Sequence, residues 1–139
     1  AAASPSEPVH EMARRTDQRK AIRQALERAE RPLSVPEILD AAQDLVPGIG
    51  VATVYRNVKL LVDEGWLPAV ELPGAPSRYE LAGQGHHHHF HCNTCDRVFD
   101  LPACPPRLLK DLAPPGFAVH DHELQLSGEC ASCTGSARG

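Results

Sequence analysis

Residues 51–65 read Val-Ala-Thr-Val-Tyr-Arg-Asn-Val-Lys-Leu-Leu-Val-Asp-Glu-Gly, and this stretch decides the fold of the first half of the chain. Apolar residues recur in it at helical spacing, which predicts a helix over 51–64 with one buried face. That face consists of Val51, Val54, Val58, Leu61 and Val62. Gly65 is a typical helix stop. The residues expected off the buried face are Thr53, Tyr55, Arg56, Asn57 and Lys59.

Two further helices are predicted before this one. Thr16 is a candidate cap for a helix over 16–29, whose alanines, Ile22 and Leu26 form a buried face. Ser34 and Glu37 have the spacing of a capping box, which predicts that a second helix opens at Val35 and runs to about Leu45.

Two short strands follow the third helix, over 66–72 and 78–81, with a turn at 73–77 that contains two prolines and a glycine. Three helices and a β-hairpin are typical of a winged helix-turn-helix, so we expect an α+β chain with a DNA-binding domain over 12–81. Base contacts are expected from Thr53, Tyr55 and Arg56. Phosphate contacts are expected from Arg14, Arg15, Arg19, Lys20 and Lys59. A basic run alone is more often a solvated helix face, and that alternative stays open.

Charge is distributed unevenly along the 139 residues, whose net charge is −4. Residues 1–60 hold nine Lys/Arg and eight Asp/Glu, whereas residues 61–139 hold five and ten. No apolar run approaches the ~20 residues that span a bilayer, so no membrane association is expected. The first residues lack the apolar core of a signal peptide, which favours a reducing cytoplasm. Residues 1–11 and 135–139 are predicted to be a disordered arm and tail.

Two Cys-x-x-Cys pairs lie in the second half, Cys92 with Cys95 and Cys130 with Cys133. In a reducing compartment such pairs hold metal more often than they form disulfides. Four thiolates suit a tetrahedral Zn²⁺ ion and leave no open position, so the site is interpreted as structural. Free thiols or a disulfide pair are the alternative.

Histidines crowd the segment before the first pair, which reads His86-His87-His88-His89-Phe90-His91-Cys92. In a strand, successive side chains point to opposite faces. His87, His89 and His91 would then share one face, and His86 and His88 the other. This alternation predicts two metal sites rather than one site with four histidines.

These motifs together resemble the ferric uptake regulator (Fur) family of metal-dependent bacterial repressors. The resemblance is carried by Ala52-Thr53-Val54-Tyr55-Arg56, by Arg78-Tyr79-Glu80-Leu81 and by the spacing of His87, His89, Cys92 and Cys95, and it covers about residues 12–133. It implies a DNA-binding domain, a hinge at 82–85 and an α/β dimerisation domain over 86–134 that holds metal. Within 86–134 the residues predict strands over 98–101 and 117–126 and a short helix over 105–112. It also implies a homodimer bound to a palindromic operator in double-stranded DNA.

The resemblance further implies the ligands of a regulatory metal at the hinge: Glu80, His87, His89 and Asp100. Many iron and peroxide sensors of the family add a histidine where this chain has Pro32, and that difference favours the zinc-sensing branch. His10 is a less favoured substitute. Some zinc sensors have Cys at the position of Glu80, which points the other way.

A second metal site is predicted at His86, His88 and His122, the last at the family's position for a second-site histidine. The family's acidic fourth ligand is missing, and Cys104 is the proposed replacement. Three His and one Cys favour zinc over iron or manganese. A buried free thiol is the alternative for Cys104, and His91 and His120 are interpreted as structural or surface residues.

The sequence therefore predicts a metal-responsive repressor of metal-uptake genes that senses zinc, with Zn²⁺ at the structural site. Sensing of Fe²⁺, Mn²⁺ or peroxide within the same family is the main alternative. A metal buffer or chaperone and a zinc enzyme are alternatives of other classes. No catalytic pattern such as His-Glu-x-x-His is present, so an enzyme is not expected.

Overall fold

The computed structural model describes residues 9–102 and 104–135 and divides into two compact units, residues 1–82 and 83–139. The division falls inside the predicted hinge at 82–85. Most of the predicted arm, residues 1–8, and the end of the predicted tail, residues 136–139, lie outside the described residues. No helix in the described part of the chain is long and apolar enough to cross a membrane.

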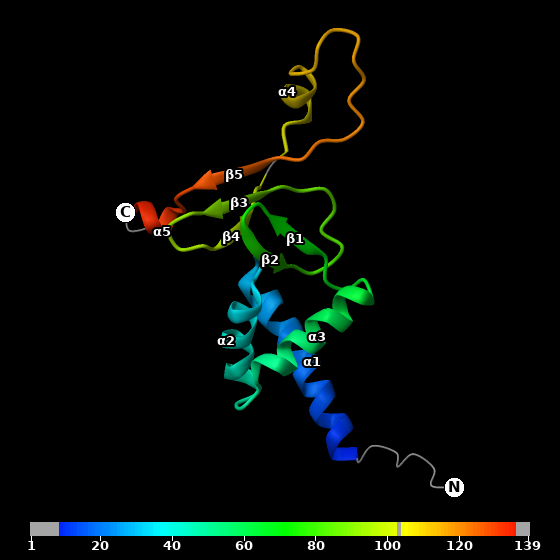
Figure 1. Ribbon diagram of the computed structural model, residues 1–139, viewed down its shortest axis with the longest axis vertical. Helices are drawn as coiled ribbons and strands as arrows, with labels where there is room; N and C mark the ends of the chain where they lie inside the picture. Colours follow the sequence, from blue (N-terminus) through cyan, green and yellow to red (C-terminus); the bar gives the residue numbers. More distant parts are fainter. Residues whose placement is uncertain (1–8, 103, 136–139) are drawn as a thin grey trace, which may run out of the picture. The chain divides into compact units, whose positions relative to one another are not determined.

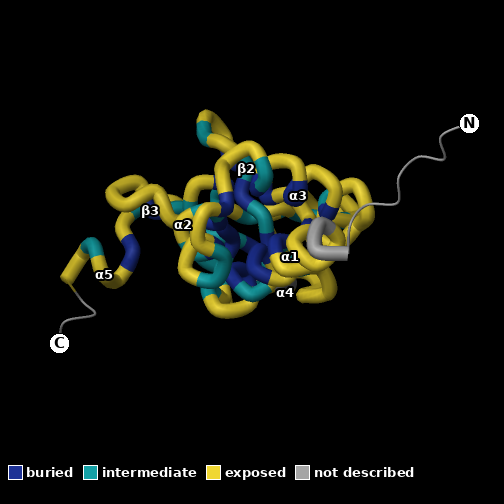
Figure 2. Tube along the Cα trace, turned by 90° about the horizontal axis from the view of Figure 1, so that it is seen from below, coloured by how far each residue is buried: buried dark blue, intermediate teal, exposed yellow. Residues whose placement is uncertain are grey.

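Three helices build the first unit: α1 (Val9–Ala29), α2 (Val35–Leu45) and α3 (Val51–Asp63). Their apolar faces pack into one core, and the buried segments gather where these helices face one another (Figure 2). Ile22, Ile38 and Val54 are fully buried in it. Burial of such side chains, at about 1.5–3 kcal/mol each, is what holds three short helices together.

The start of α1 differs from the prediction, because the helix begins at Val9 and not at Thr16. Its first residues fall within the segment predicted to be disordered. Thr16 is no cap: its hydroxyl donates to the carbonyl oxygen of Met12, 3.0 Å away, as threonine does inside helices. The opening of α2 matches the prediction, with the Glu37 amide donating to Ser34 Oγ and the Glu37 carboxylate accepting from the Ser34 amide.

The buried face of α3 also departs from the prediction at two positions. Val51 is 49 % exposed, whereas Asn57 is buried, with only 7 % of its surface exposed. The side chain of Asn57 lies between Val54 and Leu61 in the helical pattern and donates from Nδ2 to the carbonyl oxygen of Thr53 at 2.9 Å. The bond satisfies a polar group that would otherwise be buried at a cost.

The hairpin consists of β1 (Ala69–Leu72) and β2 (Ala75–Tyr79), which pair antiparallel with a register shift between Val70 and Leu72. Both strands are placed differently from the prediction of 66–72 and 78–81, and the turn is reduced to Pro73 and Gly74. Gly74 has φ 69°, a conformation that glycine adopts without strain. A bridge between Leu33 and Tyr79 ties the hairpin to the chain before α2.

The second unit contains a three-stranded sheet in which β3 (His89–Cys92) lies between β4 (Val98–Asp100) and β5 (Gln125–Gly128), as Figure 1 shows. The β3–β4 pair is antiparallel and the β3–β5 pair is parallel. Short helices α4 (Pro106–Lys110) and α5 (Ala131–Thr134) complete the unit. The winged-helix and α/β architecture thus follows the prediction.

Several bounds in this unit were predicted wrongly. The expected strand over 86–91 begins only at His89, and the expected strand over 117–126 begins only at Gln125. The predicted helix over 105–112 is shorter than expected, and α5 was not predicted.

The apolar core of the second unit is small. Within the described residues, its buried apolar side chains are those of Cys92, Val98 and Cys130. Units this small seldom fold on apolar burial alone and commonly depend on metals or partner subunits. Two of these three residues are cysteines, so the core of the unit is also a candidate metal site.

Candidate metal centres and nucleic-acid face

Four cysteine sulfurs converge at the end of the sheet. Cys92 ends β3, and Cys95 follows in the next turn. Cys130 caps the start of α5, and Cys133 lies within that helix. Sγ of Cys92 lies 3.7 Å from Sγ of Cys133, and Sγ of Cys95 lies 3.8 Å from Sγ of Cys130. All five cysteines of the chain are free thiols in this structure.

These separations fit a tetrahedral zinc ion. With Zn–S bonds of about 2.3 Å, two sulfurs of a tetrahedron stand about 3.8 Å apart. The amides of Cys95 and Cys130 donate to Sγ of Cys92 at 3.4 and 3.3 Å, which fixes that sulfur in place. The four cysteines predicted as structural ligands are therefore brought together with spacing that zinc requires.

Electrostatics in this cluster divide the four thiols. The amide of Cys95 stabilises the Cys92 thiolate and lowers the pKa of Cys92 to about 6. A hydrogen bond with Cys130 is the larger cause, and burial the next, of the rise in the pKa of Cys133 to about 12. Burial also raises the pKa of Cys95. Four adjacent thiolates repel one another, so a bound cation is needed for all four to ionise together.

The second cluster forms a closed tetrahedron of donor atoms, consisting of Nε2 of three histidines and one cysteine sulfur. The three nitrogen–nitrogen distances among His86, His88 and His122 are 3.1, 3.1 and 3.0 Å. Sγ of Cys104 lies 3.5, 3.2 and 3.0 Å from the Nε2 atoms of His86, His88 and His122, respectively. Zn–N bonds of 2.0–2.1 Å place two nitrogens about 3.3 Å apart, close to these distances.

Hydrogen bonding among the four residues does not explain this geometry. A neutral imidazole Nε2 is either a donor or an acceptor, so at least one of three mutual contacts joins two atoms of the same kind. A cation at the centre is attracted by all four lone pairs at once. Burial, reinforced by neighbouring His86 and His122, lowers the pKa of His88 and so favours the neutral ring, which is the form that binds metal.

One contact of His88 has to change when a metal binds. The amide of Leu124 donates to Nδ1 of His88 at 3.2 Å. A neutral histidine bound through Nε2 carries its proton on Nδ1, which then no longer accepts. Binding at Nε2 therefore requires the Leu124 amide to move away or find another acceptor.

A third cluster lies on the opposite face of the same segment. Nε2 of His87 and of His89 lie 3.5 and 3.3 Å from Oδ1 of Asp100, and the two rings are 4.8 Å apart. Asp100 ends β4 and pairs with His89 across the sheet. Two imidazoles and a carboxylate at this spacing suit a divalent ion. Glu80 directly follows β2 in the first unit, where it is buried.

The remaining histidines lie elsewhere. Nε2 of His91 lies 2.7 Å from Oδ1 of Asp96, and that pair closes the turn between β3 and β4. His120 is exposed. Both placements agree with their interpretation as structural or surface residues. The position of the His10 side chain lies outside the described residues.

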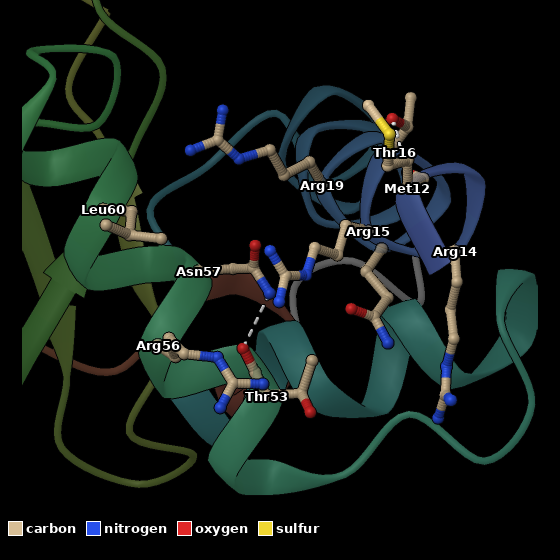
Figure 3. Close-up of a pocket in the computed structure, with 10 residues that line it drawn as sticks. Met12, Arg14, Arg15, Thr16, Arg19, Thr53, Arg56, Asn57 and Leu60 are labelled. Carbon is tan, nitrogen blue, oxygen red and sulfur yellow. Dashed lines mark hydrogen bonds between the residues drawn. The ribbon is translucent and has the colours of Figure 1, made fainter. Parts of the chain in front are cut away.

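A basic cleft of about 650 Å³ separates the first turns of α1 from α3 in the first unit. Figure 3 shows Arg14, Arg15 and Arg19 reaching from α1, opposite Thr53 and Arg56 on α3. The other predicted DNA-contacting residues, Lys20, Tyr55 and Lys59, are exposed. Arg19 also pairs with Glu64 at 2.9 Å. Cations and one face of α3 thus line the same cleft, an arrangement that would suit contact with a polyanion.

Five residues that line this cleft were not predicted to belong to it: Met12, Thr16, Gln18, Asn57 and Leu60. Met12 was missed because the helix was predicted to begin at Thr16, whereas α1 begins at Val9. Asn57 had a usable signal, because it stands three residues after Val54 and four before Leu61 and so occupies the buried stripe.

The model of the Ferric uptake regulator family matches residues 11–127 of this sequence. This chain belongs to that family. It is 33 % identical to the ferric uptake regulation protein of Bacillus subtilis over 129 residues, which covers 86 % of this chain and 85 % of that protein. A match to the Campylobacter jejuni protein of the same name, also 33 % identical, covers 70 % of this chain and 62 % of that one.

A solved structure of a zinc-bound manganese uptake regulator has the same fold, with a TM-score of 0.74 and 28 % identity over 85 % of this chain and 94 % of that one. Fur-family proteins are dimeric, DNA-binding, metal-responsive transcription regulators and not enzymes. The zinc-enzyme alternative is thereby excluded. The family includes sensors of iron, manganese, zinc and peroxide, so membership leaves the sensed metal open.

Proposed function

We propose that this Fur-family chain is a zinc-responsive repressor that binds a palindromic operator as a cytoplasmic homodimer and controls metal-uptake genes. The observation that carries the choice of zinc is the tetrahedron of His86, His88, Cys104 and His122, whose six donor–donor distances run from 3.0 to 3.5 Å. A thiolate with three imidazoles favours Zn²⁺ over Fe²⁺ and Mn²⁺, which prefer harder oxygen ligands.

The proposed structural ion is Zn²⁺ held by Cys92, Cys95, Cys130 and Cys133. Support comes from sulfur separations of 3.7 and 3.8 Å and from the amide donors to Sγ of Cys92. Because few apolar side chains are buried in the second unit, binding of this ion supplies much of the free energy of folding there.

The proposed sensor consists of His87, His89, Asp100 and Glu80. The first three are supported by their spacing around one carboxylate oxygen. Glu80 is proposed from the family resemblance of Arg78-Tyr79-Glu80-Leu81, and it lies just before the hinge. A ligand on each side of the hinge lets metal binding select one arrangement of the DNA-binding units from many, which is a population shift.

Zinc is also supported by Pro32, which stands where many iron and peroxide sensors of the family carry a ligating histidine. Pro32 is fully buried and has no side-chain donor. The proposed homodimer is supported by β5, an edge strand of the sheet formed by the described residues, on which Leu126 is 45 % exposed. An open edge with an exposed apolar side chain is suited to pairing with a second copy.

The test is operator binding by metal-stripped protein titrated separately with zinc, iron(II) and manganese, with metal counted per chain. We expect zinc to restore binding at the lowest free concentration. His87→Ala should abolish the response, whereas His120→Ala, which removes an exposed histidine, should leave it intact. Binding that persists after every site has been emptied contradicts a metal-dependent repressor.

Restoration by iron or manganese at lower free concentrations than zinc rejects zinc sensing and leaves the family assignment untouched. The metal-buffer alternative predicts that Arg56→Ala changes neither metal uptake nor DNA binding. A repressor predicts unchanged metal uptake and weakened DNA binding in that variant.

A further inference from the structure

Two charged side chains at the end of the hairpin are buried. Arg78 on β2 is 1 % exposed, and Glu80, which directly follows that strand, is 5 % exposed. No other Asp, Glu, Lys or Arg in the described part of the chain is buried. Tyr79 and Leu81, which alternate with them, pack against the helical core. Because side chains alternate along an extended segment, Arg78 and Glu80 share the opposite face.

The hairpin itself gives Arg78 a neutral acceptor and apolar neighbours. Its Nη1 donates to the carbonyl oxygen of Pro76 at 2.6 Å. Val70 pairs with Arg78 across the hairpin, and both Val70 and Leu72 are buried. A carbonyl oxygen accepts one of the five N–H groups of a guanidinium but brings no negative charge. A buried cation is costly unless an anion lies near it, and Glu80 is the buried carboxylate on the same face.

We propose that Arg78 is the counter-charge of Glu80 when the sensor is empty, and that a metal ion entering the sensor has to compete with Arg78 for this carboxylate. The inference rests on the proposed role of Glu80 as a ligand of that sensor. Without metal, the guanidinium offsets the charge of the buried carboxylate. With metal, the ion takes that role and Arg78 lies close to a second positive charge. Arg78 therefore raises the free metal concentration at which the sensor fills.

The sign of the effect on metal affinity distinguishes this role from a packing role. Loss of the guanidinium charge leaves an uncompensated buried carboxylate in the metal-free protein. It also removes a repulsion between two cations in the metal-bound protein. Both changes favour metal binding. A residue that merely supports the fold of the hairpin would weaken metal binding when it is replaced.

The charge pairing is tested first, without metal at the sensor. Full-length protein is dialysed against a chelator that empties the sensor, as checked by metal analysis, and thermal unfolding is followed by Trp66 fluorescence. We expect Arg78→Met to lower the unfolding midpoint by about 10 °C or more. The double variant Arg78→Met/Glu80→Gln should recover about half of that loss or more, because neither charge is then left alone.

Glu71 supplies the matched control for this cycle, since it is an exposed carboxylate on β1 of the same hairpin. Arg78→Met/Glu71→Gln should recover nothing. Arg78→Gln is measured alongside, because it removes the charge and keeps a donor for the Pro76 carbonyl, and it should show the same coupling to Glu80→Gln. Double variants no more stable than Arg78→Met and Arg78→Gln alone overturn the proposal.

Zinc affinity is tested second, by competition with a coloured chelator. The sensor is the zinc-binding step that His87→Ala abolishes. We expect Arg78→Met and Arg78→Gln to bind zinc at this step at least about tenfold more tightly than the wild type. Arg78→Lys, which keeps the positive charge, should stay close to the wild-type affinity. Unchanged or weaker zinc binding by the two charge-free variants overturns the proposal.

Glu80→Gln separates this inference from the ligand assignment on which it rests. If Glu80→Gln binds zinc at the sensor as tightly as the wild type, the ligand role of Glu80 fails and the competition fails with it. If Glu80→Gln loses affinity and the charge-free variants of Arg78 gain none, the ligand role stands and the competition alone is rejected.

Discussion

His88 and His89 are consecutive in the chain, yet their Nε2 atoms belong to different clusters. Nε2 of His88 lies 3.2 Å from Sγ of Cys104, and Nε2 of His89 lies 3.3 Å from Oδ1 of Asp100. One peptide unit therefore links the two candidate regulatory sites.

Removal of His122 should empty the second site alone. We expect His122→Ala to bind one zinc fewer per chain at limiting zinc, with an affinity loss larger than the roughly 10–100-fold seen on removing an outer-shell partner. Direct metal analysis after dialysis against a weak chelator measures the count. His120→Ala is the matched control, and a loss of the same size in it would reject the assignment.

The Leu124 amide should report zinc binding at that site. Because metal at Nε2 of His88 moves the remaining proton to Nδ1, the Leu124 amide loses its acceptor, now 3.2 Å away. We expect its proton resonance in a two-dimensional NMR spectrum to shift upfield on zinc addition. The same resonance should stay in place when His122→Ala is titrated over the range that fills only the other sites.

Loss of a structural cysteine should unfold the second unit and spare the first. Cys130→Ser removes one of four sulfurs and one of three buried apolar side chains in the described part of that unit. Trp66, the only tryptophan, lies in the first unit, so its fluorescence should still follow a cooperative thermal transition. Amide signals of β3 and β5 should collapse towards random-coil positions. Ser132→Ala, in the same knuckle, should retain them.

Glu37 should make the stability of the first unit depend on pH. Burial raises the pKa of Glu37, but the hydrogen bond and charge of Arg31, 2.6 Å away, and the contacts with Ser34 outweigh it, so the pKa lies below its usual 4.5. A depressed folded-state pKa means that the carboxylate stabilises the fold above pH 4.5 and loses this effect as pH falls through the folded-state pKa.

Glu37→Gln should therefore lower the free energy of unfolding by about 1 kcal/mol at pH 7. The gap from wild type should narrow as pH falls below 4.5 and close once pH has passed below the folded-state pKa, where the wild-type side chain is itself protonated. Urea unfolding followed by Trp66 fluorescence measures both values. Glu27→Gln, on the exposed side of α1, is the control. A constant gap across this pH range would refute the linkage.

Arg56 and Arg15 should contribute differently to operator binding. Arg56 on α3 is expected to contact a base, so Arg56→Ala should cost about 1–3 kcal/mol and relax the preference at one position. Arg15→Ala should weaken binding to all sequences alike and reduce the slope of log affinity against log salt by about one. Fluorescence anisotropy at several salt concentrations distinguishes the two. Arg28→Ala, an exposed arginine that does not line the cleft, is the charge control.

The division of the histidines between two metal clusters was predictable from the sequence. It follows from the alternation of side chains along an extended chain, which does not depend on a partner strand. His86 and His88 separate from His87 and His89 although regular pairing begins only at His89. The opening of α2 was predictable for a similar reason, since Ser34 and Glu37 bond locally. Close neighbours determine both features.

The wrong predictions share the opposite cause. A strand over 117–126 requires a partner of equal length, but β3 offers only His89–Cys92, so pairing with β5 is confined to Gln125–Gly128. The Thr16 hydroxyl can either cap a helix that begins there or donate to the carbonyl oxygen four residues earlier. Which of the two it does depends on whether the residues before Thr16 are already helical, as they are here. The length of the partner strand and the conformation of the preceding residues cannot be read from the few residues around each position.

The small apolar core of the second unit has a consequence during synthesis. A newly made chain has a first half that buries Ile22, Ile38 and Val54 without help, and a second half that contributes Val98 and two cysteines among its described residues. If an ion at the four cysteines completes the folding of the second half, as proposed, we expect chains made where metal is scarce to stay half-folded and open to proteases. The number of regulator molecules would then fall together with the metal supply.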